Sequence, residues 1–245
     1  MDRIVAIGSS LSPLDFQLGC LGTLSKYVNK GSELSVIIAT ERKQGADHNN
    51  EQQHQTQKDS TVTMIERTAT VEGQIEKSCK AIGASQILFA EQFDHSVVSQ
   101  ANVDVLRSLT EAINPSVALI PFYKSSGPIT RVVGRSALLA CRWVQNVLMY
   151  DIDTGAKSAF QPGIFSVLSP EQFESKKSII SNFNDVGKLE LSPDEDQKRV
   201  KFLQASQSAN VLQDKGPVEA FQSHRLLLLS SSANKENNYR GSLFQ

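Results

Sequence analysis

The chain has 245 residues, of which 40% are hydrophobic, and its 25 Lys+Arg against 26 Asp+Glu give a net charge of −1. This length suits one large domain or two small ones, and the hydrophobic content excludes a chain that is disordered throughout. The near-neutral charge excludes the strongly basic class of nucleic-acid-binding protein. Only four His and three Cys are present, so metal ligands are scarce and a disulfide scaffold is not expected.

The sequence contains no targeting or membrane-spanning segment that we can identify. No run reaches the ~18 apolar residues that a membrane helix needs. Met1–Gly8 lacks the charged start, apolar core and cleavage site of a signal peptide. We therefore expect a cytoplasmic protein with reduced thiols and no membrane span.

The first 150 residues alternate between strand and helix patterns. The predicted strands are Ile4–Ile7, Leu34–Ala39, Gln86–Ala90 and Val117–Phe122. The predicted helices are Leu18–Asn29, Met64–Ile82, Val103–Ile113 and Ile129–Val147, the first two closed by Gly31 and Gly83. The alternation predicts an α/β fold of three layers, with a Rossmann-like, mainly parallel sheet and helices on both faces.

A polar segment, Gln44–Thr61, interrupts this pattern. It contains one Ala and no larger aliphatic or aromatic residue, which is typical of a mobile loop. Two of the four histidines, His48 and His54, lie in it. Two interpretations stay open: a lid that carries metal ligands, or a solvated loop.

The pattern changes again after residue 150. We predict a single domain, 1–245, in which a small α+β cap (151–245) adjoins the core (1–150). The elements expected in the cap are a strand at Ile164–Leu168, a helix from Ser169-Pro170-Glu171 to Phe183, a helix at Asp194–Ala205, strands at Val218–His224 and Arg225–Leu229, and an irregular end, Asn234–Gln245.

The segment after the first strand, Gly8–Gly19, is the first candidate site. Ligands of open α/β sheets bind beyond the carboxyl ends of the strands, and a helix N-terminus there favours negative charge. Asp15 is the only ionisable side chain in the segment, and it is either functional or a helix cap. Ser10 and Ser12 are candidate ligand-binding residues. A serine nucleophile among Ser9, Ser10 and Ser12 has no Gly-x-Ser-x-Gly motif and no evident His partner to support it.

A second candidate region follows the strand that ends near residue 122. Tyr123 begins a polar loop, and Thr130 and Arg131 lie at the start of the next helix. Arg131 is suited to a phosphate or carboxylate group. The alternative interpretation is an ordinary surface loop.

Several segments together resemble one known family. Leu18–Leu24 reads Leu-Gly-Cys-Leu-Gly-Thr-Leu, and Val36–Thr40 ends a strand in Thr. This frame is similar to the start of the LmbE-like family, the PIG-L-type zinc N-deacetylases. The further segments that resemble the family, in the same order and over nearly the whole chain, are Glu72–Gly83, Ile113–Val117, Arg131–Ala140, Phe160–Lys177 and Arg240-Gly241. The resemblance implies the LmbE-like fold.

The family's catalytic residues carry over only in part. Its members bind zinc through the His and second Asp of a His-Pro-Asp-Asp motif and through the last His of a His-Pro-Asp-His motif, and the first Asp is the general base. The matching segments here are Ser12-Pro13-Leu14-Asp15 and Gly127-Pro128-Ile129-Thr130. The ligand Asp15 is therefore kept, whereas Leu14 stands at the base position. Val71 stands where the family has an Arg.

The remaining donors make a poor zinc site. Zinc catalysis needs about three protein ligands, and the hydroxyls of Ser12 and Thr130 are weak ligands beside Asp15. Losing the base removes a further ~10²–10⁴-fold of rate. We therefore expect no metal cofactor, although the family uses zinc.

These losses predict a degenerate, non-catalytic deacetylase homologue. It would bind a glycan or sugar nucleotide, support an active partner protein, or form a homo-oligomer. One alternative is an active N-acetyl-sugar deacetylase, or amide hydrolase, whose ligands come from His95, His224 or the His48/His54 loop. Another is a metal-free enzyme that uses Asp15 as acid or base.

Overall fold

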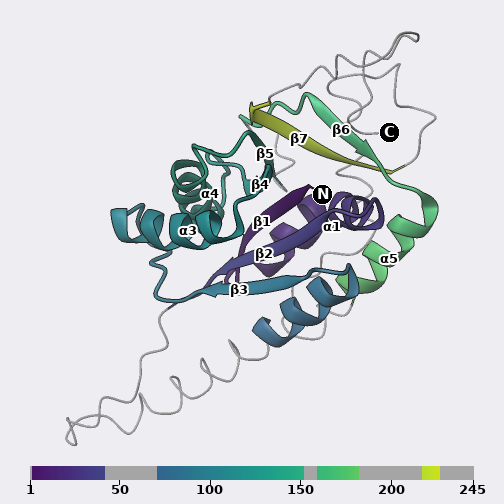
Figure 1. Ribbon diagram of the computed structural model, residues 1–245, viewed down its shortest axis with the longest axis horizontal. Coiled ribbons are helices and arrows are strands. Elements are labelled where there is room, and N and C mark those ends of the chain that lie inside the picture. The colour runs from purple at the N-terminus through teal and green to yellow at the C-terminus, as the bar shows by residue number, and fades with distance from the viewer. Residues whose placement is uncertain (1, 42–70, 152–158, 182–216, 227–245) are drawn as a thin grey trace, which may run out of the picture.

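The computed structural model describes residues 2–41, 71–151, 159–181 and 217–226, whose arrangement is shown in Figure 1. In chain order the elements are β1 (Arg3–Ser9), α1 (Pro13–Asn29), β2 (Glu33–Ala39), a helix over residues 71–81, β3 (Gln86–Ala90), α3 (Gln100–Ile113), β4 (Val117–Pro121), α4 (Pro128–Ala140), β5 (Asn146–Tyr150), β6 (Ile164–Val167), α5 (Pro170–Ser181) and β7 (Val218–Arg225).

The strands form one mixed sheet in the order β3-β2-β1-β4-β5-β7-β6. Strands β1 to β5 are parallel to one another, and β7 runs antiparallel to both β5 and β6. The order of the strands reverses between β1 and β4, where α/β folds of this kind bind ligands. The α/β fold with a mainly parallel sheet is thus confirmed.

The core lies on both faces of the sheet. Ile4 and Ala6 of β1 pack with α1, α5 and the helix of residues 71–81, whereas Val5 and Ile7 pack with α3 and α4. Figure 1 shows α3 and α4 together on one side of the sheet and α1 and α5 on the other. Burial on both faces explains why β1 is apolar from Ile4 to Ile7 instead of alternating with polar residues.

Local sequence signals account for most of the helix ends. Gly31 and Gly83 follow helices with φ of +88° and +79°, a conformation that glycine adopts without strain. Helix α5 begins as predicted, with the Ser169 hydroxyl accepting a hydrogen bond from the Gln172 N–H at 3.2 Å. Helix α1 begins at Pro13, five residues before the predicted start, so much of the Gly8–Gly19 segment is helical. Proline is favoured at the first helical position, and this preference, not the spacing of apolar residues, explains where α1 begins.

The predicted bounds of two elements are wrong. The helix predicted at Ile129–Val147 ends at Ala140, and Asn146–Tyr150 forms β5, paired in parallel with β4. Val147 fits a helical spacing, but it lies on a strand because the segment completes the sheet between β4 and β7. The predicted break between His224 and Arg225 is also wrong, since β7 continues through Arg225.

Other predictions lie outside the described residues. These are the polar loop Gln44–Thr61 with His48 and His54, the helix Asp194–Ala205, and Asn234–Gln245 with Arg240-Gly241. Among the helices of the described ranges, none combines the length and the apolar character needed to cross a membrane. All three cysteines are buried thiols outside any disulfide.

Candidate functional site

Two residues singled out from the sequence, Asp15 and Thr130, meet where the strand order reverses. Each is the third residue of a helix that begins with proline, α1 after β1 and α4 after β4. The Thr130 hydroxyl donates a hydrogen bond to Asp15 Oδ2. The N-cap of α1 is Ser12, so the interpretation of Asp15 as the helix cap is wrong.

A second hydroxyl and carboxylate lie beside this pair. The Ser125 hydroxyl donates to Asp151 Oδ1 at 3.1 Å, and the two residues are 3% and 1% exposed. A β-carbon added to Gly127 would lie 3.2 Å from Thr130 Oγ1 and 3.9 Å from Ser125 Oγ, so both hydroxyls flank this glycine. We call Asp15, Thr130, Ser125 and Asp151 the carboxylate–hydroxyl cluster.

The sequence interpretation placed Ser125 only within the polar loop that Tyr123 begins, and it did not include Asp151. Asp151 directly follows β5, a strand that the sequence analysis did not predict. A polar residue just past a buried strand is the signal that would have found it, because the carboxyl ends of parallel strands share one edge of the sheet.

Tyr150 fixes the position of α1 above this edge. Its hydroxyl donates to the Ile7 carbonyl at 2.6 Å, and a β-carbon on Gly19 of α1 would collide with its ring. Burial raises the pKa of Tyr150 well above its ordinary value, and the nearby Cys20, Asp15 and Asp151 add to this effect. Tyr150 therefore stays protonated and serves as a fixed hydrogen-bond donor.

The remaining candidates have varied surroundings. Ser12 makes no capping hydrogen bond with its side chain, and the buried Ser10 hydroxyl donates to the Ala39 carbonyl at 3.3 Å. Tyr123 packs edge-on against Phe122. Arg131 is half-buried in the first turn of α4, next to Thr130.

His95 reaches the same edge of the sheet, where it contacts Ser9. Its Nε2 lies 2.9 Å from the hydroxyl of Ser9, the last residue of β1. The two residues are 7% and 5% exposed. The sequence offered no His partner for Ser9, because 86 residues separate the two.

His224 lies elsewhere. It is exposed near the end of β7, whose Ser223 and Arg225 pair with the amino-terminal half of β5. That half is at the opposite edge of the sheet from Asp15.

The donors around Asp15 do not fit a catalytic zinc ion. The Thr130 hydroxyl donates a hydrogen bond to the Asp15 carboxylate. Its oxygen is neutral and is therefore a weak ligand for zinc. In the part of the chain that the structure describes, no three His, Cys, Asp or Glu residues are grouped to hold a metal. Val71, which stands where the family has an Arg, packs against the apolar core. Leu14 lies in the first turn of α1, and the structure does not describe its side chain.

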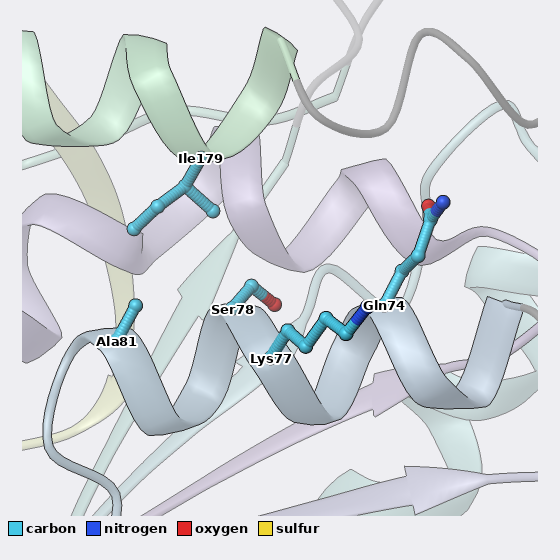
Figure 2. Close-up of a pocket in the computed structure, with 5 residues that line it drawn as sticks. All are labelled: Gln74, Lys77, Ser78, Ala81 and Ile179. Carbon is cyan, nitrogen blue, oxygen red and sulfur yellow. The ribbon is translucent and has the colours of Figure 1, made fainter.

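A hollow of about 360 Å³ lies away from these residues, between the helix of residues 71–81 and α5. Figure 2 shows Gln74, Lys77, Ser78 and Ala81 on the first helix and Ile179 projecting from the second. Ser78 also accepts a hydrogen bond from the buried Gln17 of α1 at 3.4 Å. None of the residues predicted for the site lines this hollow.

Comparisons with known proteins bear on the fold. No protein-family model and no curated protein matches the sequence. Among solved structures, the N,N'-diacetylchitobiose deacetylase of Pyrococcus horikoshii, in complex with an inhibitor, is similar with a TM-score of 0.59 and 16% identity, over 91% of this chain and 83% of that one. The zinc-inhibited form of teicoplanin deacetylase Orf2 gives 0.63 and 14%, over 90% and 97%.

One similar structure belongs to another class of enzyme. GalB, the 4-carboxy-2-hydroxymuconate hydratase of Pseudomonas putida KT2440, gives a TM-score of 0.69 at 11% identity, over 95% of this chain and 100% of that one. The same fold therefore serves more than one reaction, and function must be argued from the site. The chain has the fold of the LmbE-like, PIG-L-type deacetylases, as the sequence resemblance predicted.

Proposed function

We propose that this protein is a deacetylase homologue without zinc-dependent hydrolysis, which binds a sugar or sugar nucleotide at the carboxyl edge of β1 and β4. The observation that carries the proposal is the hydrogen bond from Thr130 to Asp15. These residues stand where the family resemblance implies a His and an Asp ligand of zinc. A hydroxyl bonded to a carboxylate cannot replace an imidazole on a metal.

The same groups suit a polyhydroxylated ligand. Carboxylate oxygens accept hydrogen bonds from sugar hydroxyls, and Ser or Thr hydroxyls donate as well as accept. Arg131, in the first turn of α4, would pair with the phosphate of a sugar nucleotide. The chitobiose and teicoplanin deacetylases of this fold support a sugar as the ligand class.

Calorimetric titration with N-acetylglucosamine and its uridine diphosphate conjugate tests the binding. We expect saturable binding that Asp15→Asn weakens by about 10-fold or more, because a hydrogen bond to a charged group contributes about 1.5–3 kcal/mol. Asp104→Asn is the matched control, since Asp104 is an exposed acid on α3 that pairs with Arg107. Equal affinity in both variants and the wild type would contradict the assignment of Asp15 to the site.

Metal analysis tests the loss of zinc catalysis separately. We expect less than stoichiometric zinc after incubation with the ion, and no amide hydrolysis across a panel of N-acetylglucosamine conjugates. Chelator-sensitive turnover that Asp15→Asn abolishes would instead establish an active deacetylase with unusual ligands.

A further inference from the structure

Ser9 and His95 form a buried hydroxyl–imidazole pair that the proposed sugar site does not use. Ser9 ends β1, and His95 lies in the loop after β3, across the end of β2. The Phe93 N–H, which donates to the Thr40 carbonyl at 3.0 Å, fastens this loop to the strand end. The fold therefore holds Ser9 Oγ and His95 Nε2 2.9 Å apart at the edge of the sheet where ligands of α/β proteins bind.

The surroundings of the pair suit a hydrogen bond from Ser9 to His95. The Leu11 N–H donates to Ser9 Oγ at 3.1 Å and so occupies one of the oxygen's lone pairs. Burial lowers the pKa of His95 below its ordinary 6.5, which favours the neutral imidazole at neutral pH. The neutral tautomer that carries its proton at Nδ1 accepts the Ser9 proton at Nε2, and this is the arrangement of a nucleophile and its general base.

A purely structural role leaves one feature unexplained. His95 Nδ1 is buried and makes no hydrogen bond of good geometry among the described residues, although the carbonyls of Ala39 and Phe93 act on the ring. An apolar residue at this position would avoid burying a polar atom without a well-formed hydrogen bond. No side chain in the described ranges bonds Nδ1, so the pair is a dyad and not a triad.

We propose that Ser9 is a nucleophile and His95 its general base, and that this dyad cleaves carboxylic esters. Ser9 Oγ attacks the carbonyl carbon while its proton passes to His95 Nε2. The new Oγ–C bond replaces the ester C–O bond, and the proton on Nε2 moves to the departing alcohol. Water then attacks the acyl-serine, gives its proton to Nε2 and releases the carboxylic acid as Ser9 regains its proton.

The Leu11 N–H positions the Ser9 hydroxyl. It donates to Ser9 Oγ and so holds the hydroxyl in one orientation beside His95. The reaction consumes only an ester and water and needs no metal, oxidant or cofactor.

Covalent labelling of the full chain tests the proposal. After incubation with a fluorophosphonate probe, peptide mass spectrometry should place a single adduct on Ser9, and the chain should hydrolyse 4-nitrophenyl acetate with the same residue acylated. His95→Gln should slow both reactions by about 10²-fold or more, the usual contribution of a general base. No adduct, an adduct on another residue, or wild-type labelling of His95→Gln would overturn it.

Two matched controls come from the opposite edge of the sheet. Ser85 is an exposed serine whose hydroxyl donates to the Leu34 carbonyl, and His224 is an exposed histidine. Ser85→Ala and His224→Gln should label Ser9 at the wild-type rate.

Ser9→Cys gives a second test of the pair that does not depend on ester chemistry. The thiol that this substitution introduces should react with iodoacetamide faster than Cys20, Cys79 or Cys141, which are buried. Burial raises the pKa of Cys79 and Cys141 to about 12, so these thiols are unreactive at neutral pH. An introduced thiol no more reactive than the three native ones, or as reactive with His95→Gln as without it, would overturn the proposal.

Discussion

At the scale of single residues, burial decides the charge of His95. Removal from water disfavours the imidazolium, and this effect outweighs the neighbouring Glu41 and Asp94 carboxylates and the carbonyls of Ala39 and Phe93, all of which favour it. The folded protein therefore holds His95 neutral over a pH range in which the unfolded chain protonates it.

This difference predicts a loss of stability in mild acid. The unfolded chain binds the His95 proton near pH 6.5, whereas the folded chain binds it only at lower pH. The contribution of His95 to stability is thus constant above pH 6.5 and falls as the pH drops toward the folded pKa, by at most about 1.4 kcal/mol per pH unit. Urea unfolding at pH 5 and pH 8 should show a smaller pH effect for His95→Gln than for the wild type. An equal effect in both proteins would mean that His95 titrates normally.

The sequence located only part of the site. Asp15 and Thr130 could be found because they sit in two short motifs at the starts of helices, and helix starts after parallel strands converge at one edge. The contact of Ser9 with His95 and the position of Asp151 depend on which strands are neighbours and on their register. A single sequence carries little information on either property.

At the scale of elements, a buried ion pair holds α1, α5 and β7 together. Lys176 of α5 lies 3.0 Å from the Glu219 carboxylate of β7, and the side chains are 2% and 1% exposed. Lys176 also donates to the Leu18 carbonyl at 2.7 Å, and Glu219 accepts hydrogen bonds from the N–H groups of Gly22 and Thr23 at 2.9 and 2.7 Å. All the backbone groups involved belong to α1, the helix that carries Asp15.

Breaking this pair should be costly. Lys176→Met leaves the Glu219 charge buried without its cation, and we expect a loss of about 3–5 kcal/mol in the free energy of unfolding. The control is Lys177→Met, which removes an exposed pair with Glu174 on the same helix and should cost at most about 1 kcal/mol. Urea denaturation of both variants gives the comparison. Equal losses would mean that the buried pair contributes no more than a surface pair.

The sequence predicts the end of a helix correctly where neighbouring residues determine that end. Ser169-Pro170 and Gly83 mark helix ends by capping and by backbone conformation, and both were predicted. Strand β5 was not predicted, because the apolar segment Asn146–Tyr150 fits a helix as well as a strand. Its pairing with β4 makes it a strand.

At the scale of the whole molecule, the last strands belong to the same sheet as the first. Strand β7 pairs with β5, and β6 pairs with β7, so the segment after residue 150 extends the core sheet by two strands. Glu219 of β7 bonds α1, which packs on β1. Residues of α1 and of β7, which are about 200 positions apart in the sequence, therefore share one network of buried contacts.

This continuity predicts a single cooperative unfolding transition. Trp143 is the only tryptophan and lies between α4 and β5, so its fluorescence reports on the segment that joins these two elements. Far-UV circular dichroism reports on all helices and strands together, and the two signals should change at the same denaturant concentration. Glu219→Gln weakens contacts between β7 and α1, and it should shift both curves to lower denaturant by the same amount. If this substitution instead produced an early transition in circular dichroism alone, the segment after residue 150 would be a separate folding unit, and the single domain proposed for residues 1–245 would be wrong.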